Sequence, residues 1–262
     1  MQLLIDAGNT RIKWAVPVAD AATLATLAYT GQAPVWLHSG SVSHAELANL
    51  DSVWRAMPIT RILISNVAGA AIRAQLSAIL QDVQPAADVR WFASQERVAG
   101  IHNTYRNPAQ LGCDRLASMV GAHYLFPLQN LVVATCGTAT TVDAVTAQGQ
   151  FQGGMILPGL NLMAESLARN TAQLPQVAES ISLAGIFADN TDQAIVSGCI
   201  SAQVGAIRRA VSVLEEQQKQ SVTCVISGGA APYLLAHLGL PYQHVDNLVL
   251  TGLFVVAQSS PD

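Results

Sequence analysis

Two short glycine-centred segments hold residue types that suit the binding of phosphate. One lies within residues 131–143, LVVATCGTATTVD, where an apolar run meets Gly137 and β-branched residues follow. This pattern predicts a strand, a tight turn and a returning strand. The turn would expose the backbone N–H groups and hydroxyls of Gly137, Thr138 and Ala139, which are neutral donors for phosphate oxygens. A plain turn between two strands is the alternative interpretation.

The same pattern occurs near the N-terminus. An apolar strand over residues 2–7 leads into Asp6-Ala7-Gly8-Asn9-Thr10, and residues 12–16 return with alternation around Lys13. A carboxylate such as that of Asp6 can hold Mg²⁺ through water, because this ion keeps part of its hydration shell. Asp6 could also simply cap the turn. Lys13 could reach a transferring phosphate, or it could be a solvated strand lysine.

A third group is the adjacent pair Asp114 and Arg115. A carboxylate near a hydroxyl can accept its proton while a bond to phosphorus forms, which is the role of a general base. The planar guanidinium of Arg115 suits a carboxylate or a developing phosphate charge. The alternative is an aspartate that complements a helix dipole, with the arginine in a salt bridge. The residues alone leave both interpretations open.

The elements that would position these groups follow a regular order in the first half of the chain. Hydrophobic periodicity and the capping-box spacing of Ser43 and Glu46 predict three strands, then helix, strand, helix and strand. These elements are expected at residues 2–7, 12–16, 35–38, 43–57, 62–65, 72–83 and 89–92. Residues 93–111 show no sustained period and are expected to form an irregular loop, and long loops are often functional. Residues 114–125 predict a connecting helix.

From residue 130 the order starts again. Strands are expected at 130–134, from 141, at 151–156, 223–226 and 242–245, with helices after 159, over 191–217, at 232–238 and from 248. The repeated order predicts an α/β fold of two similar domains, residues 1–113 and 114–262. Facing domains of this kind would bring one turn from each half to a central nucleotide cleft.

The composition limits the class of protein. The chain has 262 residues, 51% of them hydrophobic and 11% charged, and a formal net charge of −4. The apolar runs are too short to span a bilayer, and the first residues lack the basic start of a signal peptide, so we expect a cytoplasmic protein without membrane contact. Without a basic cluster we expect no nucleic-acid partner. Four cysteines without C-x-x-C spacing argue against zinc and for reduced thiols, at positions 113, 136, 199 and 224.

Six motifs occur in order along nearly the whole chain. They are Asp6 to Thr10, Tyr105 with Pro108, Leu111-Gly112-Cys113-Asp114-Arg115, Gly137 to Asp143, Gly153-Gly154 with Pro158-Gly159, and Ser227-Gly228-Gly229. Together they resemble the type III pantothenate kinases, some of which carry the older name Bvg accessory factor. This family belongs to the superfamily of acetate and sugar kinases, Hsc70 and actin, so the resemblance implies that the two α/β domains are actin-like, ribonuclease H-like domains facing a central nucleotide cleft.

The resemblance implies a homodimeric kinase that uses ATP and Mg²⁺ to convert pantothenate to 4′-phosphopantothenate, which opens coenzyme A synthesis. It implies that Asp114 is the catalytic base and that Asp6 holds Mg²⁺ through water. The implied nucleotide-binding residues are Asp6, Ala7, Gly8, Asn9, Thr10, Arg11, Ile12, Lys13, Gly137, Thr138, Ala139, Gly228 and Gly229. The implied pantothenate-binding residues are Tyr105, Gly112, Cys113, Asp114, Arg115 and, from the partner subunit, Thr191.

Several of these residues have simpler interpretations. Tyr105 could be an ordinary packed tyrosine, Thr191 an N-cap or first-turn residue, and Gly228-Gly229 a tight turn between strand and helix. Thr171 is a weaker candidate for substrate contact. One departure from the family pattern stands out, because many members have an aspartate implicated in monovalent-cation binding where this chain has Thr135. A hydroxyl is a poorer ligand than a carboxylate, so we expect a weakened or differently met requirement for K⁺ or NH₄⁺.

Two other functions fit part of the pattern. One is a non-catalytic accessory protein of a transcription factor, which the older family name suggests. The other is a sugar or acetate kinase of the same superfamily, from which residues 105–115 would distinguish this chain.

Overall fold

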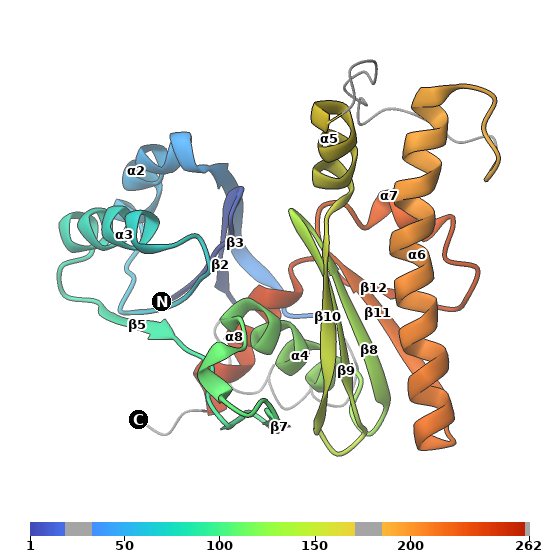
Figure 1. Cartoon of the computed structure of the whole chain (residues 1–262). Coiled ribbons are helices and arrows are strands. Elements are labelled where there is room, and N and C mark those ends of the chain that lie inside the picture. Colours follow the sequence, from blue (N-terminus) through green and yellow to red (C-terminus); the bar gives the residue numbers. More distant parts are fainter. Residues whose placement is uncertain (19–32, 171–184, 260–262) are drawn as a thin grey trace. The chain divides into compact units, whose positions relative to one another are not determined.

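The computed structural model describes residues 1–18, 33–170 and 185–259 (Figure 1). Thr171 lies outside the described residues. Contacts divide the chain into two compact units. The first contains residues 1–128, 147–151 and 247–262, and the second contains residues 129–146 and 152–246. The sequence-based boundary after residue 113 differs from this division, which groups the following helix and the C-terminal helix with the first unit.

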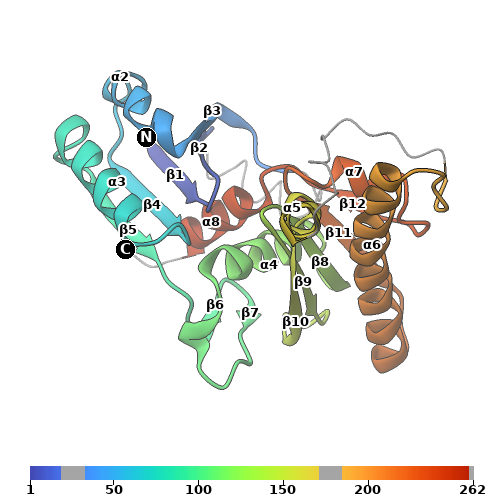
Figure 2. The same ribbon diagram turned by 45° about the horizontal axis from the view of Figure 1, so that its top comes forward.

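The first unit is built on a five-stranded sheet of order β3-β2-β1-β4-β5. Strands β1 (Gln2–Ala7), β2 (Arg11–Pro17) and β3 (Trp36–Ser43) pair antiparallel, whereas β4 (Arg61–Asn66) pairs parallel with β1 and with β5 (Asp88–Phe92). Figure 2 shows β1 between β2 and β4. Because β1 is central, the residues at its carboxyl end have a neighbouring strand on each side.

One face of this sheet packs against η1 (His44–Asn49), α2 (Leu50–Arg55) and α3 (Ala70–Val83). Alternate strand residues point to the same face, so the odd-numbered residues of β1 join this core. Its buried members include Leu3, Ile5, Ile12, Trp54, Ile64 and Leu76. Burial of such side chains contributes roughly 1.5–3 kcal/mol each, which makes this core the main support of the unit.

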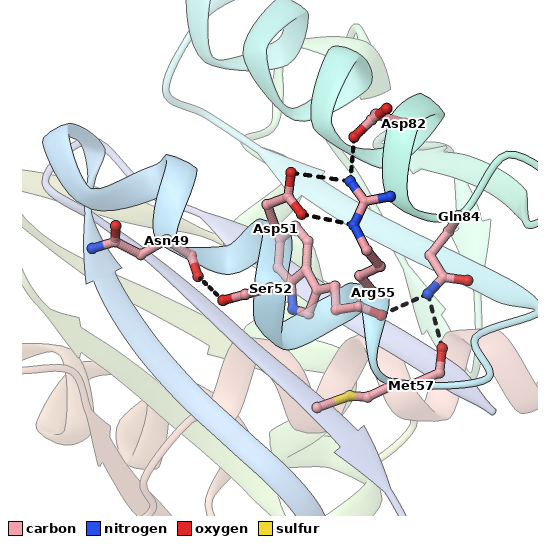
Figure 3. A network of polar contacts seen from close by, with 8 residues as sticks. Asn49, Asp51, Ser52, Arg55, Met57, Asp82 and Gln84 are labelled. Atoms are coloured by element: carbon pink, nitrogen blue, oxygen red, sulfur yellow. Dashed lines mark hydrogen bonds and ion pairs between the residues drawn. The ribbon is translucent and has the colours of Figure 1, made fainter.

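A polar network links α2 to α3 on the outside of this core (Figure 3). Arg55 donates to Asp51 at 3.0 Å and also pairs with Asp82 on α3. Gln84 donates to the carbonyl oxygens of Trp54 and Met57 at 2.6 and 2.8 Å. The ion pairs are about half exposed and therefore stabilise the unit only weakly.

The other face packs against α4 (Cys113–Leu125) and α8 (Leu248–Ser259). These helices lie side by side in Figures 1 and 2 and approach very closely. A Cβ atom on Gly252 would lie 1.8 Å from the carbonyl oxygen of Ala117, and one on Gly121 would lie 2.7 Å from that of Leu248. The two glycines therefore allow the backbone contact that brings the first residue of α4 to the sheet.

The second unit repeats the sheet, with the order β10-β9-β8-β11-β12. Its strands are β8 (Asn130–Cys136), β9 (Ala139–Val145), β10 (Phe151–Pro158), β11 (Val222–Ser227) and β12 (Gln243–His244). As in the first unit, the first two strands pair antiparallel and the central strand pairs parallel with the fourth. This confirms the α/β fold and the repeat predicted from element order.

Helices of the second unit cover one face of its sheet. They are α6 (Thr191–Gln218) and α7 (Pro232–Leu235), which bury a core that includes Val132, Val142, Ile207, Cys224 and Ile226. Helix α5 (Leu160–Asn170) packs against α6. All four cysteines are unpaired thiols.

The predicted irregular loop at 93–111 is wrong in part. It contains a small hairpin of β6 (Arg97–Val98) and β7 (Ile101–His102) and a 3₁₀ turn, η2 (Pro108–Gln110). The predicted helix at 43–57 begins as the 3₁₀ helix η1, and β3 extends further than expected. No described helix combines the length and apolar character needed to cross a membrane.

Candidate active site

Asp6 lies at the carboxyl end of β1 with a polar residue on each neighbouring strand. Its Cα partner on β2 is Lys13, and its partner on β4 is Ser65. Register partners point to the same face of a sheet, so the three side chains share the face that packs against α4 and α8. The hairpin itself was predicted from the sequence, and the register that pairs Asp6 with Lys13 comes from the structure.

The charge balance around Asp6 is unusual. Burial and the nearby carboxylate of Asp114 raise the pKa of Asp6 to about 7, although the ammonium of Lys13 opposes this increase. Two carboxylates that repel each other in a partly buried place favour a cation between or beside them. The arrangement therefore fits a hydrated Mg²⁺ held by Asp6. No cluster of three or more metal-binding side chains occurs among the described residues.

Asp114 is the second residue of α4, where the N-cap is Gly112. Its Oδ1 accepts a hydrogen bond of 2.8 Å from the backbone N–H of Arg115, and burial raises its pKa. A Cβ atom on Gly112 would lie 2.7 Å from the same Oδ1. The missing side chain of Gly112 thus leaves the space that the carboxylate uses.

Arg115 is buried and points toward Tyr105. Its Nη1 donates to the Tyr105 hydroxyl at 3.1 Å, and its guanidinium lies 5.8 Å from the centre of the Tyr105 ring. The ring in turn stacks on Phe151 with centroids 5.4 Å apart. Because the tyrosine hydroxyl accepts from Arg115, its own proton is directed away and can be donated to a ligand.

Asn103 fixes the loop that carries Tyr105. It is buried, and its side chain donates to the carbonyl oxygens of Gln95 and Pro108 at 3.2 and 3.0 Å. Its Oδ1 accepts from the backbone N–H of Tyr105 at 3.1 Å. The side-chain amide of Asn103 therefore holds this irregular backbone together and fixes the position of Tyr105.

Cys113 connects α4 to β4. Its sulfur lies 3.3 Å from the hydroxyl of Ser65 and donates weakly to the carbonyl of Asn66 at 3.7 Å. Burial raises the pKa of this thiol, which disfavours the thiolate form. Since Ser65 is the β4 partner of Asp6, this contact ties the start of α4 to the strand beside Asp6.

The turn between β1 and β2 is accessible at Asn9 and Thr10. The N–H of Gly8 donates to the carbonyl of Arg11 at 3.1 Å. The Arg11 guanidinium donates to the hydroxyl and the carbonyl oxygen of Ser41. The side chains of Ala7 and Ile12 are fully buried in the core. Of the predicted nucleotide-binding set, Ala7 and Ile12 therefore offer only backbone atoms.

The corresponding turn of the second unit is equally accessible. Gly137, Thr138 and Ala139 are exposed, and the N–H of Gly137 donates to the carbonyl of Ala139 at 3.0 Å. The N–H of Gly159 donates to the carbonyl of Thr138 at 2.9 Å, and a Cβ atom on Gly159 would lie 2.1 Å from the carbonyl oxygen of Gly137. Gly159 therefore permits α5 to begin directly against this turn.

Gly228 brings a second segment to the same turn. It has φ +100°, which favours glycine, and a Cβ atom on it would lie 2.2 Å from the carbonyl oxygen of Cys136. The N–H of Ala230 donates to that same carbonyl at 3.0 Å. The predicted residues Gly137 to Ala139 and Gly228-Gly229 thus form one group within the second unit.

Thr135 and Thr191 complete the predicted residues. Thr135 occupies the place in β8 that Asp6 occupies in β1, two residues before the turn glycine, and its register partners are Thr141 and Ser227. Thr191 is the exposed first residue of α6, and Asn190 is the cap, accepting from the N–H of Gln193 at 3.0 Å. The first-turn interpretation of Thr191 is confirmed.

Sequence reasoning missed the residues that support the site from distant elements. They are Ser65 beside Asp6, Asn103 and Phe151 around Tyr105, and His44 at the turn, whose Nε2 lies 2.8 Å from the carbonyl oxygen of Gly8. A polar residue directly at the end of the apolar strand β4 was the available signal for Ser65.

Comparison with known proteins identifies the family of this chain. The family model described as Type III pantothenate kinase matches residues 2–213. The chain is 53% identical over 267 residues to a type III pantothenate kinase of Janthinobacterium sp. (strain Marseille), covering 100% of this chain and 99% of the relative. It is 52% identical over 259 residues to that of Herminiimonas arsenicoxydans, covering 98% and 97%.

A solved structure supports the fold. A protein from Sinorhizobium meliloti, assigned as a 2-dehydro-3-deoxygalactonokinase, superposes with a TM-score of 0.61 at 16% identity and 99% coverage of each chain. This likeness confirms the two-domain, actin-like architecture. The match of the family model and the identity to full-length relatives decide the family: the chain belongs to the type III pantothenate kinases.

Proposed function

We propose that this chain transfers the γ-phosphoryl group of ATP to the primary hydroxyl of pantothenate, giving 4′-phosphopantothenate and ADP, the first step of coenzyme A synthesis. Family membership supports the activity. The observation that carries the assignment of the chemistry is the position of Asp114, at the start of α4 near Asp6 and next to Arg115.

Asp114 is the general base of this proposal. It accepts the proton of the pantothenate hydroxyl while the hydroxyl oxygen forms a bond to the γ-phosphorus and the bond to the bridging oxygen of ADP breaks. Burial raises the pKa of Asp114 and so makes it a better proton acceptor than an exposed aspartate. Gly112 keeps the space around its Oδ1 open.

Arg115 and Tyr105 orient the substrate. The buried guanidinium offsets negative charge, and its hydrogen bond fixes the direction in which the Tyr105 hydroxyl can donate. Stacking on Phe151 holds the ring in place. Gly112 and Cys113, which precede the base, complete the proposed pantothenate contacts on this chain.

Each of the two turns is a phosphate-binding segment in this proposal. The segment from Asp6 to Lys13 and the segment from Gly137 to Ala139 provide N–H and hydroxyl donors for phosphate oxygens, and Lys13 offsets their charge. Gly228-Gly229 allows close approach by adenosine. Asp6 would hold Mg²⁺ through water, and the ion supplies charge neutralisation on the phosphates.

This chain lacks the carboxylate that many relatives have at the proposed site of a monovalent cation. A threonine at position 135 offers a hydroxyl where many relatives have a carboxylate, and its register partners, Thr141 and Ser227, also carry hydroxyls. We therefore expect a weak dependence on K⁺ or NH₄⁺, because neutral oxygens bind these ions less strongly than a carboxylate does.

A homodimer completes the proposal, with Thr191 of one chain reaching the pantothenate of the other. Large apolar side chains of the second unit are exposed in the single chain, including Ile156 at 65% and Phe187 at 96%. Free thiols at all four cysteines fit the proposed cytoplasmic location, where disulfides are rare.

A coupled assay of ADP release with and without pantothenate tests the function. Release that depends on pantothenate is expected. ATP hydrolysis that ignores pantothenate, or turnover with sugars or acetate instead, would contradict it, and no turnover with any acceptor would favour the non-catalytic accessory protein.

A further inference from the structure

His44 contacts the first phosphate turn from outside the hairpin. Its Nε2 lies 2.8 Å from the carbonyl oxygen of Gly8, and the ring is half-buried. A carbonyl oxygen can only accept, so Nε2 carries the hydrogen and donates it. None of the six family motifs includes this residue, which lies within the capping-box spacing of Ser43 and Glu46.

The end of β3 and the start of η1 position His44 beside the turn between β1 and β2. Ser43 is the β3 partner of Arg11, which puts the end of β3 beside the start of β2. Ser43 and Glu46 form a capping box, in which the Glu46 carboxylate accepts from the Ser43 backbone N–H at 3.0 Å and from its hydroxyl at 2.8 Å. This box fixes the first residue of η1, which is His44.

The contact sets the orientation of a peptide group in the turn. The peptide between Gly8 and Asn9 is trans, so the Gly8 carbonyl and the Asn9 N–H point in opposite directions. The Gly8 N–H is already used, because it donates to Arg11. When His44 holds the carbonyl on its own side, it directs the Asn9 N–H to the opposite side and keeps the carbonyl dipole from repelling an anion.

We propose that His44 is a positioning residue for ATP, which orients the Gly8–Asn9 peptide so that the turn presents an N–H donor, and not a carbonyl oxygen, to the nucleotide phosphates. The inference rests on the proposed phosphate-binding role of residues 6–13. Hydrogen bonds in series strengthen each other, so donation to the Gly8 carbonyl also makes the Asn9 N–H a better donor.

Steady-state kinetics on the full-length enzyme test the proposal. His44→Phe keeps a flat aromatic ring of somewhat larger size and removes the donor, whereas His44→Gln keeps an N–H donor at similar reach. For His44→Phe we expect the KM for ATP to rise roughly five- to tenfold, with the KM for pantothenate unchanged. His44→Gln should restore most of the affinity. His38→Phe, an exposed histidine on β3, is the matched control and should behave as wild type.

A second pair keeps the test decisive if the phenylalanine variant does not fold. His44→Asn has the same amide as His44→Gln but is one methylene shorter, so only the longer side chain should restore the KM for ATP. An unchanged KM for ATP in folded Phe and Asn variants, an equal rise for both substrates, or failure of a folded Gln variant to restore binding would overturn the proposal.

The turn itself is tested separately with Thr10→Val. If that variant raises the KM for ATP and the His44 variants do not, only the role of His44 is refuted. If neither changes it, the phosphate-binding role of the turn fails as well. A wild-type enzyme without pantothenate-dependent ADP release would refute the activity.

Discussion

At the scale of single residues, the carboxylate of Asp114 is the clearest target. Replacement by asparagine keeps the size of the side chain but removes the proton acceptor, so kcat should fall by roughly 10²–10⁴-fold while the fold persists. Initial rates and thermal unfolding measure the two effects.

Asp51 provides the matched control for Asp114. It is also the second residue of its helix, α2, and lies outside the site (Figure 3). Asp51→Asn should cost a small amount of stability and no activity. Near wild-type turnover in Asp114→Asn would exclude Asp114 as the base.

Gly112 gives an independent test of the same carboxylate. Its φ of −56° is accessible to alanine, so the backbone should tolerate Gly112→Ala, but the new Cβ atom would lie 2.7 Å from Asp114 Oδ1 and displace it. A small displacement of a reacting group can reduce a rate about 10²-fold, so kcat should drop by at least about tenfold.

Gly205 is the control for the added methyl group. It lies within α6 with open space around the position of a Cβ atom. Gly205→Ala should be slightly more stable than wild type, by up to about 1 kcal/mol, with unchanged kcat. If Gly112→Ala also keeps its kcat, the space beside Asp114 has no role in positioning the base.

Thr135 leads to a prediction about salts. Initial rates measured in K⁺ and in Na⁺ at equal ionic strength should agree within about twofold, because the residue offers only a neutral oxygen. Thr135→Asp should introduce a preference for K⁺. Strong activation of the wild-type enzyme by K⁺ would show that another group takes over the missing carboxylate.

The sequence predicted the two glycine hairpins but not the side chains that contact them. The hairpin that carries Asp6 and Lys13 could be predicted because its two strands are neighbours in the chain. Ser65 and His44 come from β4 and η1, and their approach to the turn depends on pairing between strands far apart in the chain. Nothing in residue spacing encodes that pairing.

At the scale of elements, the strand β11 carries a thiol that makes stability depend on pH. Burial, with a smaller contribution from Cys136, raises the pKa of Cys224 from 9.0 to about 12. The folded protein therefore keeps this thiol protonated at a pH where the unfolded chain ionises it. The resulting stabilisation is complete below about pH 9 and is lost as the pH rises from 9 to 12.

Urea unfolding of wild type and Cys224→Val at pH 8 and pH 10 measures this effect. The free energy of unfolding of wild type should fall by about 1 kcal/mol more than that of the variant over this interval. The variant itself serves as the control for tyrosines and lysines that titrate in the same range. Equal losses in both proteins would contradict a buried, protonated Cys224.

The elements with strong periodicity were predictable and the short ones were not. The order of the main strands and helices followed from apolar patterns, whereas β6 and β7 have two residues each and show no pattern. Their turn uses Ala99 and Gly100, both with positive φ, and alanine is not a residue that signals such a turn. The close packing of α4 on α8 depends on Gly121 and Gly252, which the sequence did not mark as contact residues.

At the scale of the whole molecule, the repeat has kept its topology and changed its residues. Both sheets place the strand before the glycine turn at their centre, but Asp6 and Lys13 in one correspond to Thr135 and Thr141 in the other, while the serine on the fourth strand is kept as Ser65 and Ser227. The first unit thus carries charged groups where the second carries hydroxyls. This difference fits the proposal, in which both turns bind phosphate but only the first unit holds the metal ion and the catalytic base.

The proposed dimer predicts complementation between inactive subunits. If Thr191 serves the site of the neighbouring chain, Thr191→Val should impair pantothenate binding without disturbing α6, because Asn190 is the cap. In a heterodimer of Asp114→Asn and Thr191→Val chains, one site has both changes and the other has neither. Random exchange of equal amounts makes about half of the dimers heterodimers, and each of these has one intact site out of two. The mixture should therefore reach roughly a quarter of wild-type activity.

Mixing Asp114→Asn with Gly112→Ala chains is the matched control, since both residues belong to the same chain's site and every heterodimer site keeps one defect. That mixture should gain no activity. Capture of one chain through an affinity tag, followed by a test for the untagged chain in the captured dimers, shows whether exchange has taken place. If subunits exchange and the mixture with Thr191→Val gains no activity, Thr191 acts within its own chain or not at all. If the protein is a monomer with full activity, the site needs no residue from a neighbouring chain.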